Sequence, residues 1–298
     1  MSKKINKTLS KSLICVFSLV LILLLFNVFI AFATPEYVAE VNNTRYENYT
    51  DAWNAVSNGG TITMLADWTT DKVLTVNEGK TVTINMDGFM INRNLNVDKS
   101  SGEVFLVTPN AVLYINGYIN GQPNSTQEHK GTIQNDVWHY NKNGNHSITG
   151  ALITGGYNSN GGGAIHIQKN AEVIIKNVTI AGNASSDGNG AGAIRLQGKN
   201  AKLTLTDSEI CYNKATSDGG GAIRIEGEDS DVKIYGTKIH HNIATDSGSY
   251  GGAIQINHGK VTIGRSSNRV SEISFNSTTF WFLRFSFSFF ACSNLNLP

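Results

Sequence analysis

The sequence predicts an all-β protein, a right-handed parallel β-helix, and three markers that recur in one phase carry this prediction. A Gly-Gly-Ala-Ile-type segment, an alternating apolar triplet and an Ile-x-x-Asn motif each occur in four copies, about 30 residues apart. The glycine-rich segments end at Ile165, Ile194, Ile223 and Ile254, the triplets begin at Val173, Leu203, Val232 and Val261, and the motifs begin at Ile180, Ile210, Ile239 and Ile273. Self-similarity at such a period is the signature of a solenoid.

Each copy contains short apolar-alternating stretches separated by glycine, asparagine and aspartate. In the first clear copy these stretches are residues 165–167, 173–175 and 178–180. Alternation indicates strands with one buried face, and the residues between them indicate turns. A strand of three residues cannot bury its apolar side alone. We therefore expect each strand to pair with its equivalent in the next copy, about 4.8 Å along the axis.

Glycine and asparagine are expected at the corners. The glycine runs should let adjacent copies approach closely and supply backbone conformations that are closed to other residues. Asparagine tolerates a left-handed corner, and its amide can bond to the asparagine of the neighbouring copy. Because the glycine runs return in every copy, corners are favoured over phosphate loops. The sequence predicts a structural ladder formed by Asn183, Asn213, Asn242 and Asn276.

Residues 1–33 have the layout of a secretory signal peptide. Four lysines precede an apolar run, and the segment ends in a small-bulky-small cleavage motif at Ala33. The alternative is an uncleaved anchor, because the apolar stretch is long enough to span a bilayer. Both interpretations predict export, and hence an extracellular location, secreted or at the cell surface.

The region between the signal and the clear repeats continues the same pattern more loosely. Residues 34–60 are expected to form an N-terminal cap with one short amphipathic helix near Thr50, which would cover the open end of the first coil. The β-helix is expected over residues 61–276, with the clearest repeats at 161–276. Residues 122–159 are polar and weakly patterned, and we expect a long loop or coils with extended corners.

The last segment, residues 277–298, is an atypical aromatic tail that holds six phenylalanines between Phe280 and Phe290. The change of composition in mid-repeat indicates a truncated or out-of-frame reading. The alternative is a strand or capping edge formed by the alternating phenylalanines. If the reading is truncated, any C-terminal anchor or further domain would be missing from this chain.

Charge and cysteine content narrow the range of partners. Without its signal the chain keeps 20 basic against 23 acidic residues, and it contains no basic stripe, so nucleic acid is not an expected partner. Cys211 and Cys292 are the only cysteines outside the signal, so a disulfide framework is not expected.

The repeats resemble those of a known family of β-helical adhesins. The paired Gly-Gly-Ala-Ile and Ile-x-x-Asn motifs are similar to the Gly-Gly-Ala-[Ile/Leu/Val] and Phe-x-x-Asn repeats of the polymorphic outer membrane proteins, with isoleucine in place of phenylalanine. This chain has no room for the C-terminal barrel of that family. The stretch from Thr44 to Asp67 resembles the entry segment of pectin-lyase-like surface proteins of Gram-positive bacteria. The resemblance implies a pectin-lyase-like β-helix and an adhesin-like role.

Candidate binding residues are expected to stack on the outer side of the coils. The residue after each Ala-Ile should point outward, and two arginines in such a column could bind an acidic glycan, whereas the alternative is an ordinary solvated face. This column consists of His166, Arg195, Arg224 and Gln255. A corner column of Asp187, Asp218 and Asp246 could hold calcium, although aspartate beside glycine is also typical of turns. No other metal ion and no cofactor is expected.

Catalytic signatures are sparse. The chain has no Asp-Asp pair of the kind used by polygalacturonases, and His258-Gly259 is better explained as a turn. His240-His241 is interpreted as surface, since no third metal ligand is evident nearby.

The sequence therefore favours a secreted or cell-surface β-helix with an adhesin-like binding role toward glycans, a polysaccharide or a host or neighbouring surface. One alternative is a polysaccharide lyase or glycoside hydrolase, with His129, Trp138, His139 and His146 helping to form a cleft. The other alternative is a purely structural stalk. An acidic cluster beside Arg195 and Arg224 would favour the enzyme, and a bare flat face would favour binding or the stalk.

Overall fold

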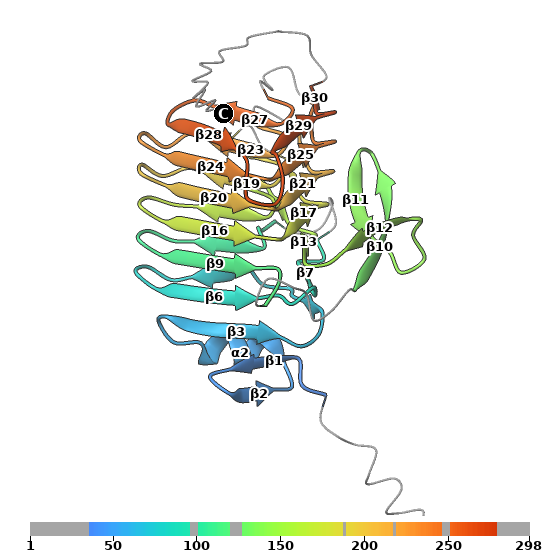
Figure 1. Cartoon of the computed structure of the whole chain (residues 1–298), viewed down its shortest axis with the longest axis vertical. Helices are drawn as coiled ribbons and strands as arrows, with labels where there is room; N and C mark the ends of the chain where they lie inside the picture. The colour runs from blue at the N-terminus through green and yellow to red at the C-terminus, as the bar shows by residue number, and fades with distance from the viewer. Residues whose placement is uncertain are drawn as a thin grey trace, which may run out of the picture. The chain divides into compact units, whose positions relative to one another are not determined.

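The computed structural model describes residues 36–95, 101–119, 127–186, 189–216, 219–245 and 251–278. The chain divides into two units, residues 1–37 and 38–298, and the strands and the helix all belong to the second. The second unit is mostly β with one short helix, a parallel β-solenoid of about 6 turns (Figure 1). The predicted fold class is confirmed. The predicted signal peptide and most of the aromatic tail lie outside the described residues.

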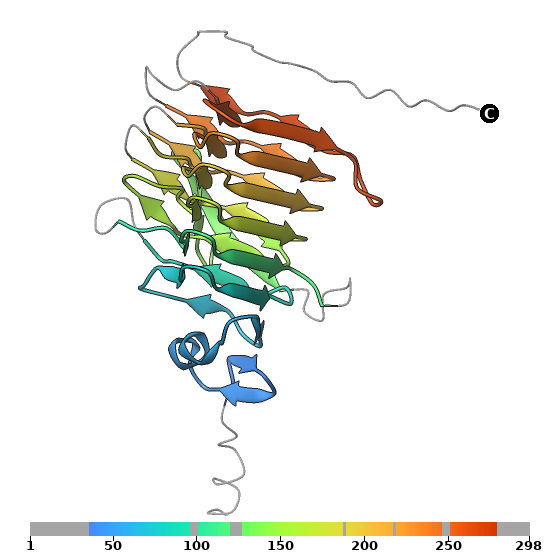
Figure 2. The same ribbon diagram turned by 90° about the vertical axis from the view of Figure 1, so that its left-hand side faces the viewer.

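Parallel strands from successive coils stack into four sheets, which run side by side along the solenoid (Figures 1 and 2). Sheet A begins with the short antiparallel strands β1 (Ala39–Val41) and β2 (Thr44–Tyr46). It continues with the longer parallel strands β3 (Gly60–Met64), β6 (Thr81–Asn85), β9 (Val112–Asn116), β16 (Glu172–Lys176), β20 (Lys202–Thr206), β24 (Asp231–Tyr235) and β28 (Lys260–Gly264). Sheet B contains β4 (Trp68–Thr69), β7 (Met90–Asn92), β13 (Leu152–Thr154), β17 (Thr179–Ala181), β21 (Glu209–Cys211), β25 (Lys238–His240) and β29 (Glu272–Ser274).

The other two sheets complete each coil. Sheet C contains β5 (Leu74–Val76), β8 (Phe105–Val107), β15 (Ile165–Ile167), β19 (Ile194–Leu196), β23 (Ile223–Ile225) and β27 (Ile254–Ile256). Sheet D contains two-residue strands, β14 (Tyr157–Asn158), β18 (Ala184–Ser185), β22 (Lys214–Ala215), β26 (Ile243–Ala244) and β30 (Ser277–Thr278). The alternation predicts the strands of sheets A, B and C in each repeat, whereas the strands of sheet D are too short to give a periodic signal.

The core fills the inside of the coils with one aliphatic side chain above another. Ile165 pairs with Ile194, Ile194 with Ile223, and Ile223 with Ile254, and the first three are fully buried. Val173, Leu203 and Val232 form a second such row from sheet A, and all three are fully buried. Burying apolar surface at about 25 cal/mol per Å² is the main stabilising contribution of such rows.

The N-terminal cap consists of a helix and a hairpin. Helix α2 (Tyr49–Ala55) begins after Asn48, whose side chain accepts a hydrogen bond from the Asp51 N–H at 2.9 Å, so the N-cap is Asn48 rather than a residue at the predicted start near Thr50. Tyr49 and Ala52 join the main core. Strand β1 pairs antiparallel with β3 and so covers the first edge of sheet A, which the sequence pattern did not indicate.

The region predicted as a long loop or extended corners contains an inserted sheet. Strands β10 (Glu128–Gln134), β11 (Val137–Tyr140) and β12 (His146–Thr149) form an antiparallel sheet between β9 and β13, visible beside sheet B in Figure 1. Its Trp138 packs in a small core with Met90, Leu152 and Cys211 on the outer side of sheet B. From β13 onward, the remainder of this region already belongs to the solenoid.

The predicted asparagine ladder is present at the corner between sheets B and D. The Asn183 side chain donates to Asn213 Oδ1 at 3.0 Å, Asn213 donates to Asn242 at 2.9 Å, and Asn242 donates to Asn276 at 3.0 Å. The predicted left-handed conformation belongs instead to the preceding residue of each coil. These left-handed residues are Gly182, Tyr212, His241 and Phe275.

The glycine runs serve close approach between coils rather than unusual backbone conformations. Within the described residues, no glycine of these runs has a positive φ. A Cβ added at Gly192 would lie 2.0 Å from the Gly221 carbonyl oxygen, and one at Gly163 would lie 2.3 Å from that of Gly192. The prediction of close approach is correct, and the prediction of backbone conformations closed to other residues is wrong for these positions.

Within the described residues, the structure contains no helix both long enough and apolar enough to cross a membrane.

Candidate functional site

The candidate binding column stacks in the predicted register on sheet C. His166 pairs with Arg195, Arg195 with Arg224, and Arg224 with Gln255. Their exposed fractions are only 8, 3, 4 and 6%, so the column is neither a solvated face nor an open binding face. The expectation of outward exposure was wrong because the loop that leads from sheet D to sheet C covers the column. The Arg195 guanidinium donates to the backbone carbonyl of Asn160 in that loop at 2.7 Å, and Arg224 donates to Asn189 at 3.2 Å.

A single carboxylate joins the two arginines. Glu226 Oε2 lies 2.6 Å from one guanidinium nitrogen of Arg195, and Oε1 lies 2.6 Å from one of Arg224. The arginine side chains are 3 and 5% exposed and that of Glu226 is 18% exposed, so all three are shielded from water. Charge-assisted pairs of this kind are strong when partly buried, and removing one partner is costly.

Sequence reasoning missed Glu226, although the repeat contains a signal for it. Glu226 follows β23 directly, as Gln197 follows β19 and Gln168 follows β15. The equivalent position is therefore an amide in two coils and a carboxylate in the coil of Arg224. This change indicates where the charge of the arginines is compensated.

A second carboxylate lies near His166. The Nδ1 atom of His166 is 3.9 Å from Glu103 Oε1, and its Nε2 atom is 2.7 Å from the Gln197 side-chain oxygen. Burial lowers the pKa of His166 and raises the pKa of Glu103, so the imidazole is held neutral. Glu103 also accepts a hydrogen bond from Asn158 and faces the charge of Arg93. We call Arg93, Glu103, His166, Arg195, Arg224 and Glu226 the buried charge row.

Most polar groups of the buried charge row are bonded to one another or to the segments around them, and the buried Nε atom of Arg93 is an exception. Arg93 reaches the Thr70 carbonyl at 3.4 Å, Glu103 is bonded to Asn158, and Glu226 is bonded to both arginines. A catalytic acid or base must reach a substrate proton within hydrogen-bond distance. In this closed arrangement the two carboxylates hold structure together, and either would have to be uncovered before it could act on a polymer.

The outer side of sheet A differs from that of sheet C because its outward side chains from β6 to β28 are half-buried or exposed rather than buried. Three columns of outward side chains run along it in register, and the middle column passes from Thr83 through Tyr114 and Ile174 to Thr204 and Lys233. Tyr114 is 38% exposed, and Lys176, Lys202, Lys233 and Lys260 are all exposed. Among the acidic residues of this side, Asp231 lies 3.6 Å from both Lys233 and Lys260. We call this surface the sheet A face.

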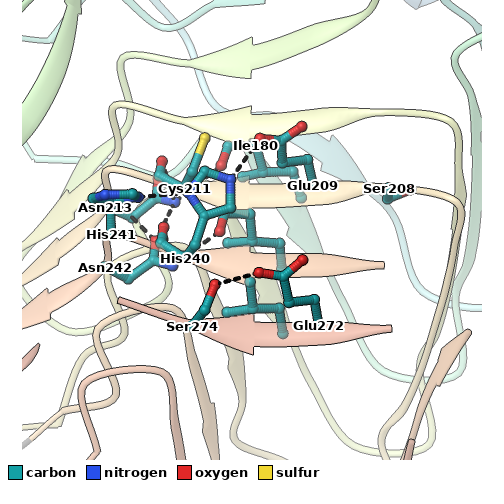
Figure 3. A network of polar contacts seen from close by, with 12 residues as sticks. Ile180, Ser208, Glu209, Cys211, Asn213, His240, His241, Asn242, Glu272 and Ser274 are labelled. Carbon is teal, nitrogen blue, oxygen red and sulfur yellow. Dashed lines mark hydrogen bonds and ion pairs between the residues drawn. The ribbon is translucent and has the colours of Figure 1, made fainter. Parts of the chain in front are cut away.

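The outer side of sheet B brings together three side chains of different chemistry (Figure 3). Cys211 of β21 pairs with His240 of β25, and Glu209 lies two residues before Cys211 on the same side of its strand. His240 Nε2 lies 2.6 Å from Glu209 Oε1. The Cys211 sulfur, an imidazole nitrogen of His240 and a carboxylate oxygen of Glu209 all lie within 4.8 Å of one another.

His240 and His241 were interpreted as surface because no third metal ligand was evident nearby, and this cluster shows that further ligand atoms do lie near His240. The side chains missing from that interpretation come from the previous coil, because Cys211 lies 29 residues before His240, which is one repeat. The repeat length could therefore have identified Cys211, and Glu209 follows from strand alternation. His241 lies at the left-handed corner, where its ring stacks between those of Tyr212 and Phe275.

The remaining sequence candidates are the aspartate column and the His258-Gly259 dipeptide. The calcium candidates Asp187, Asp218 and Asp246 lie outside the described residues. His258 and Gly259 occupy an exposed turn in which Gly259 has a φ of +87°, in keeping with the turn interpretation.

Two of the four residues expected to help form an enzyme's cleft are buried. His129 and Trp138 are 2 and 1% exposed, and His129 lies 3.2 Å from the Gly88 carbonyl oxygen. Both residues are therefore used in packing against the solenoid, whereas His146 is exposed at the far strand.

Comparison with known proteins adds no relative to this picture. No protein-family model matches the chain, and neither the curated proteins nor the solved structures contain a match.

Proposed function

We propose that this protein is a secreted or cell-surface solenoid with an adhesin-like role, which binds an extended polymer such as a glycan along the sheet A face. The observation that carries the proposal is the exposure of this face over successive coils in unbroken register. A rigid surface with a repeat of about 4.8 Å can present the same side chains many times to a repeating ligand. The resemblance of the repeats to those of β-helical adhesins supports the same role.

The chemistry of the sheet A face suits an acidic or mixed polysaccharide. Four exposed lysines stand among threonines, and within the described residues no ion pair involves Lys176 or Lys202. Tyr114 and Tyr235 add amphipathic rings, a residue type enriched at binding surfaces. The buried charge row on sheet C, by contrast, is closed by its own contacts and offers little to a ligand.

A test of this proposal measures retention and cleavage together. The purified protein is passed over immobilised acidic and neutral polysaccharides, with and without calcium, and both bound protein and released ends are measured. We expect retention without cleavage, weakened in Tyr114→Ala/Lys202→Ala and at high salt, because exposed charges are screened. Lys142→Ala, an exposed lysine in a turn of the inserted sheet, is the matched control and should bind as the wild type does.

A second candidate function, a polysaccharide lyase or hydrolase, is favoured by one observation. Glu226 beside Arg195 and Arg224 places one carboxylate next to two basic groups, residue types that can serve in general acid-base catalysis. Unsaturated or reducing ends that increase with protein concentration and vanish in Glu226→Gln would overturn the binding proposal in favour of this enzyme. If the assay shows no retention and no cleavage, the remaining interpretation is a structural stalk.

A further inference from the structure

The outer side of sheet B carries a set of ligand atoms that the proposed function does not use. Sulfur, imidazole nitrogen and carboxylate oxygen from Cys211, His240 and Glu209 lie within 4.8 Å of one another on two hydrogen-bonded strands (Figure 3). These are the three donor types that bind Zn²⁺ in proteins. We propose that this cluster is a binding site for a divalent transition-metal ion of the zinc class, with a fourth position open to solvent.

The spacing of the cluster fits such an ion after a small adjustment. With Zn–S near about 2.3 Å and Zn–N or Zn–O near about 2.0–2.2 Å, the donors of a tetrahedral site lie roughly 3.3–3.8 Å apart. The upper limit of 4.8 Å for this cluster is wider, and the His240–Glu209 contact of 2.6 Å is shorter. Rotation of the Glu209 side chain, which is 35% exposed, opens that contact without moving the strands.

One ligand of the site is buried and the other two are partly exposed. Cys211 is 2% exposed and packs with Trp138, Leu152 and Met90. The His240 and Glu209 side chains are 19 and 35% exposed, so an ion has an approach from solvent. Three protein ligands and one solvent position are the usual composition of an open zinc site.

An outer contact orients the histidine for this task. The Nδ1 atom of His240 lies 2.7 Å from Nδ1 of His241, whose ring is held in the stack between Tyr212 and Phe275. In the ion-free arrangement Nε2 donates its proton to Glu209. When an ion binds, this proton leaves Nε2, and a proton on Nδ1, donated to His241, leaves the Nε2 lone pair free for the ion. Metal-binding histidines in general are fixed by such a partner at the second ring nitrogen.

Charge favours the same occupant. A Cys211 thiolate and the Glu209 carboxylate together neutralise a dication, and the thiol proton leaves to solvent when the sulfur binds. The other charged groups around the cluster include Lys238, which lies beside Glu209 in the strand register, Arg269, and Glu272 of the next coil. A nucleophilic thiol suits this place less well. Cys211 is only 2% exposed, and burial together with the charge of Glu209 raises the pKa of its thiol, whereas reactive cysteines lie in electropositive and partly exposed surroundings.

The test is a Co²⁺ titration of the full chain, purified without a polyhistidine tag and kept reduced. Cobalt is the probe because a thiolate ligand gives a sulfur-to-metal charge-transfer band, and competition with Zn²⁺ then reports zinc affinity. We expect one ion per chain with this band, loss of the band in Cys211→Ala, and at least about tenfold weaker zinc binding in Glu209→Gln and His240→Gln. Alanine at position 211 reproduces Ala181, which occupies the same register in the coil below.

Matched controls separate the site from other cysteines and histidines. Cys292→Ala and His258→Gln should keep both the band and the affinity. Absence of a band in the wild type, its persistence in Cys211→Ala, or its equal loss in Cys292→Ala would overturn the assignment. His240→Gln carries the decision if Cys211→Ala does not fold, because its side chain is partly exposed, and zinc should raise the melting temperature of the wild type but not of this variant. The result is independent of the polysaccharide assay.

Discussion

Replacing Asn213 with leucine tests whether the asparagine ladder stabilises the stack of coils. The side chain is fully buried and donates to the carbonyls of Ile180 and Cys211 at 2.9 and 3.0 Å and to Asn242 at 2.9 Å. Its oxygen accepts from both the backbone and the side-chain nitrogen of Asn183 at 3.0 Å. Asn213→Leu leaves the Asn183 N–H without this acceptor and removes one donor from each of two carbonyls.

The expected loss follows from counting those groups. A buried donor or acceptor left unsatisfied costs roughly 1–3 kcal/mol, and a carbonyl with a second lone pair costs toward the lower end. We expect Asn213→Leu to lower the free energy of unfolding by about 3–5 kcal/mol, or the melting temperature by roughly 6–20 °C. Urea unfolding followed by circular dichroism measures the first quantity.

Two further variants make the result decisive. Asn257→Leu changes an exposed asparagine and should stay within about 0.5 kcal/mol of the wild type. Asn276→Leu, at the half-buried end of the ladder, should cost less than Asn213→Leu. Equal losses at Asn213, Asn257 and Asn276, or a wild-type melting temperature in Asn213→Leu, would refute the argument from burial.

The remaining predictions concern the buried charge row and the glycine corners. Glu226→Gln should lower the free energy of unfolding by about 3–5 kcal/mol in urea, because it leaves two buried guanidinium groups without their carboxylate; a change below about 1 kcal/mol would contradict this. For the same reason Arg195→Ala/Arg224→Ala should unfold more easily than the wild type, whereas an open binding face would leave folding intact. Burial lowers the pKa of His166, so this histidine binds a proton more readily in the unfolded chain than in the folded one. The free energy of unfolding should therefore fall as the pH drops below about 6.5. Urea unfolding at several pH values measures this dependence, which should be weaker in His166→Gln. Gly192→Ala should cost about 3 kcal/mol or more, since its Cβ would meet the Gly221 carbonyl oxygen, whereas Lys142→Ala should change little.

The sequence was most informative where every coil repeats the same residue type. Isoleucines 29 residues apart located the strands of sheet C, and Ile-x-x-Asn located the ladder to the residue, because stacking requires equivalent positions to face one another. The inserted sheet was missed because one sheet interrupts a single coil and therefore has no second copy for comparison. Strand β4 of two residues gave too short a pattern to detect.

The character of the candidate sites could be predicted only in part. The residues that follow each Ala-Ile do point outward, as predicted. Their exposure, however, is determined by a loop that folds over the next coil through Asn160, and periodicity does not predict the path of such a loop. The cluster of Glu209, Cys211 and His240 differs because its residues are related by the repeat itself. Aligning polar residues one repeat apart brings Cys211 to His240, and strand alternation then places Glu209 on the same side as Cys211.

Because the coils stack in unbroken register, the length of the solenoid depends directly on the number of repeats. Residues 194–222 form one full repeat, and their removal would join Ala193 to Ile223 with Ile165 now paired to Ile223 and Asn183 bonded to Asn242. Each repeat gained or lost therefore changes the length by about 4.8 Å while the cross-section stays the same. Relatives of different length would hold whatever is attached to their two ends at separations that differ by whole steps of this unit.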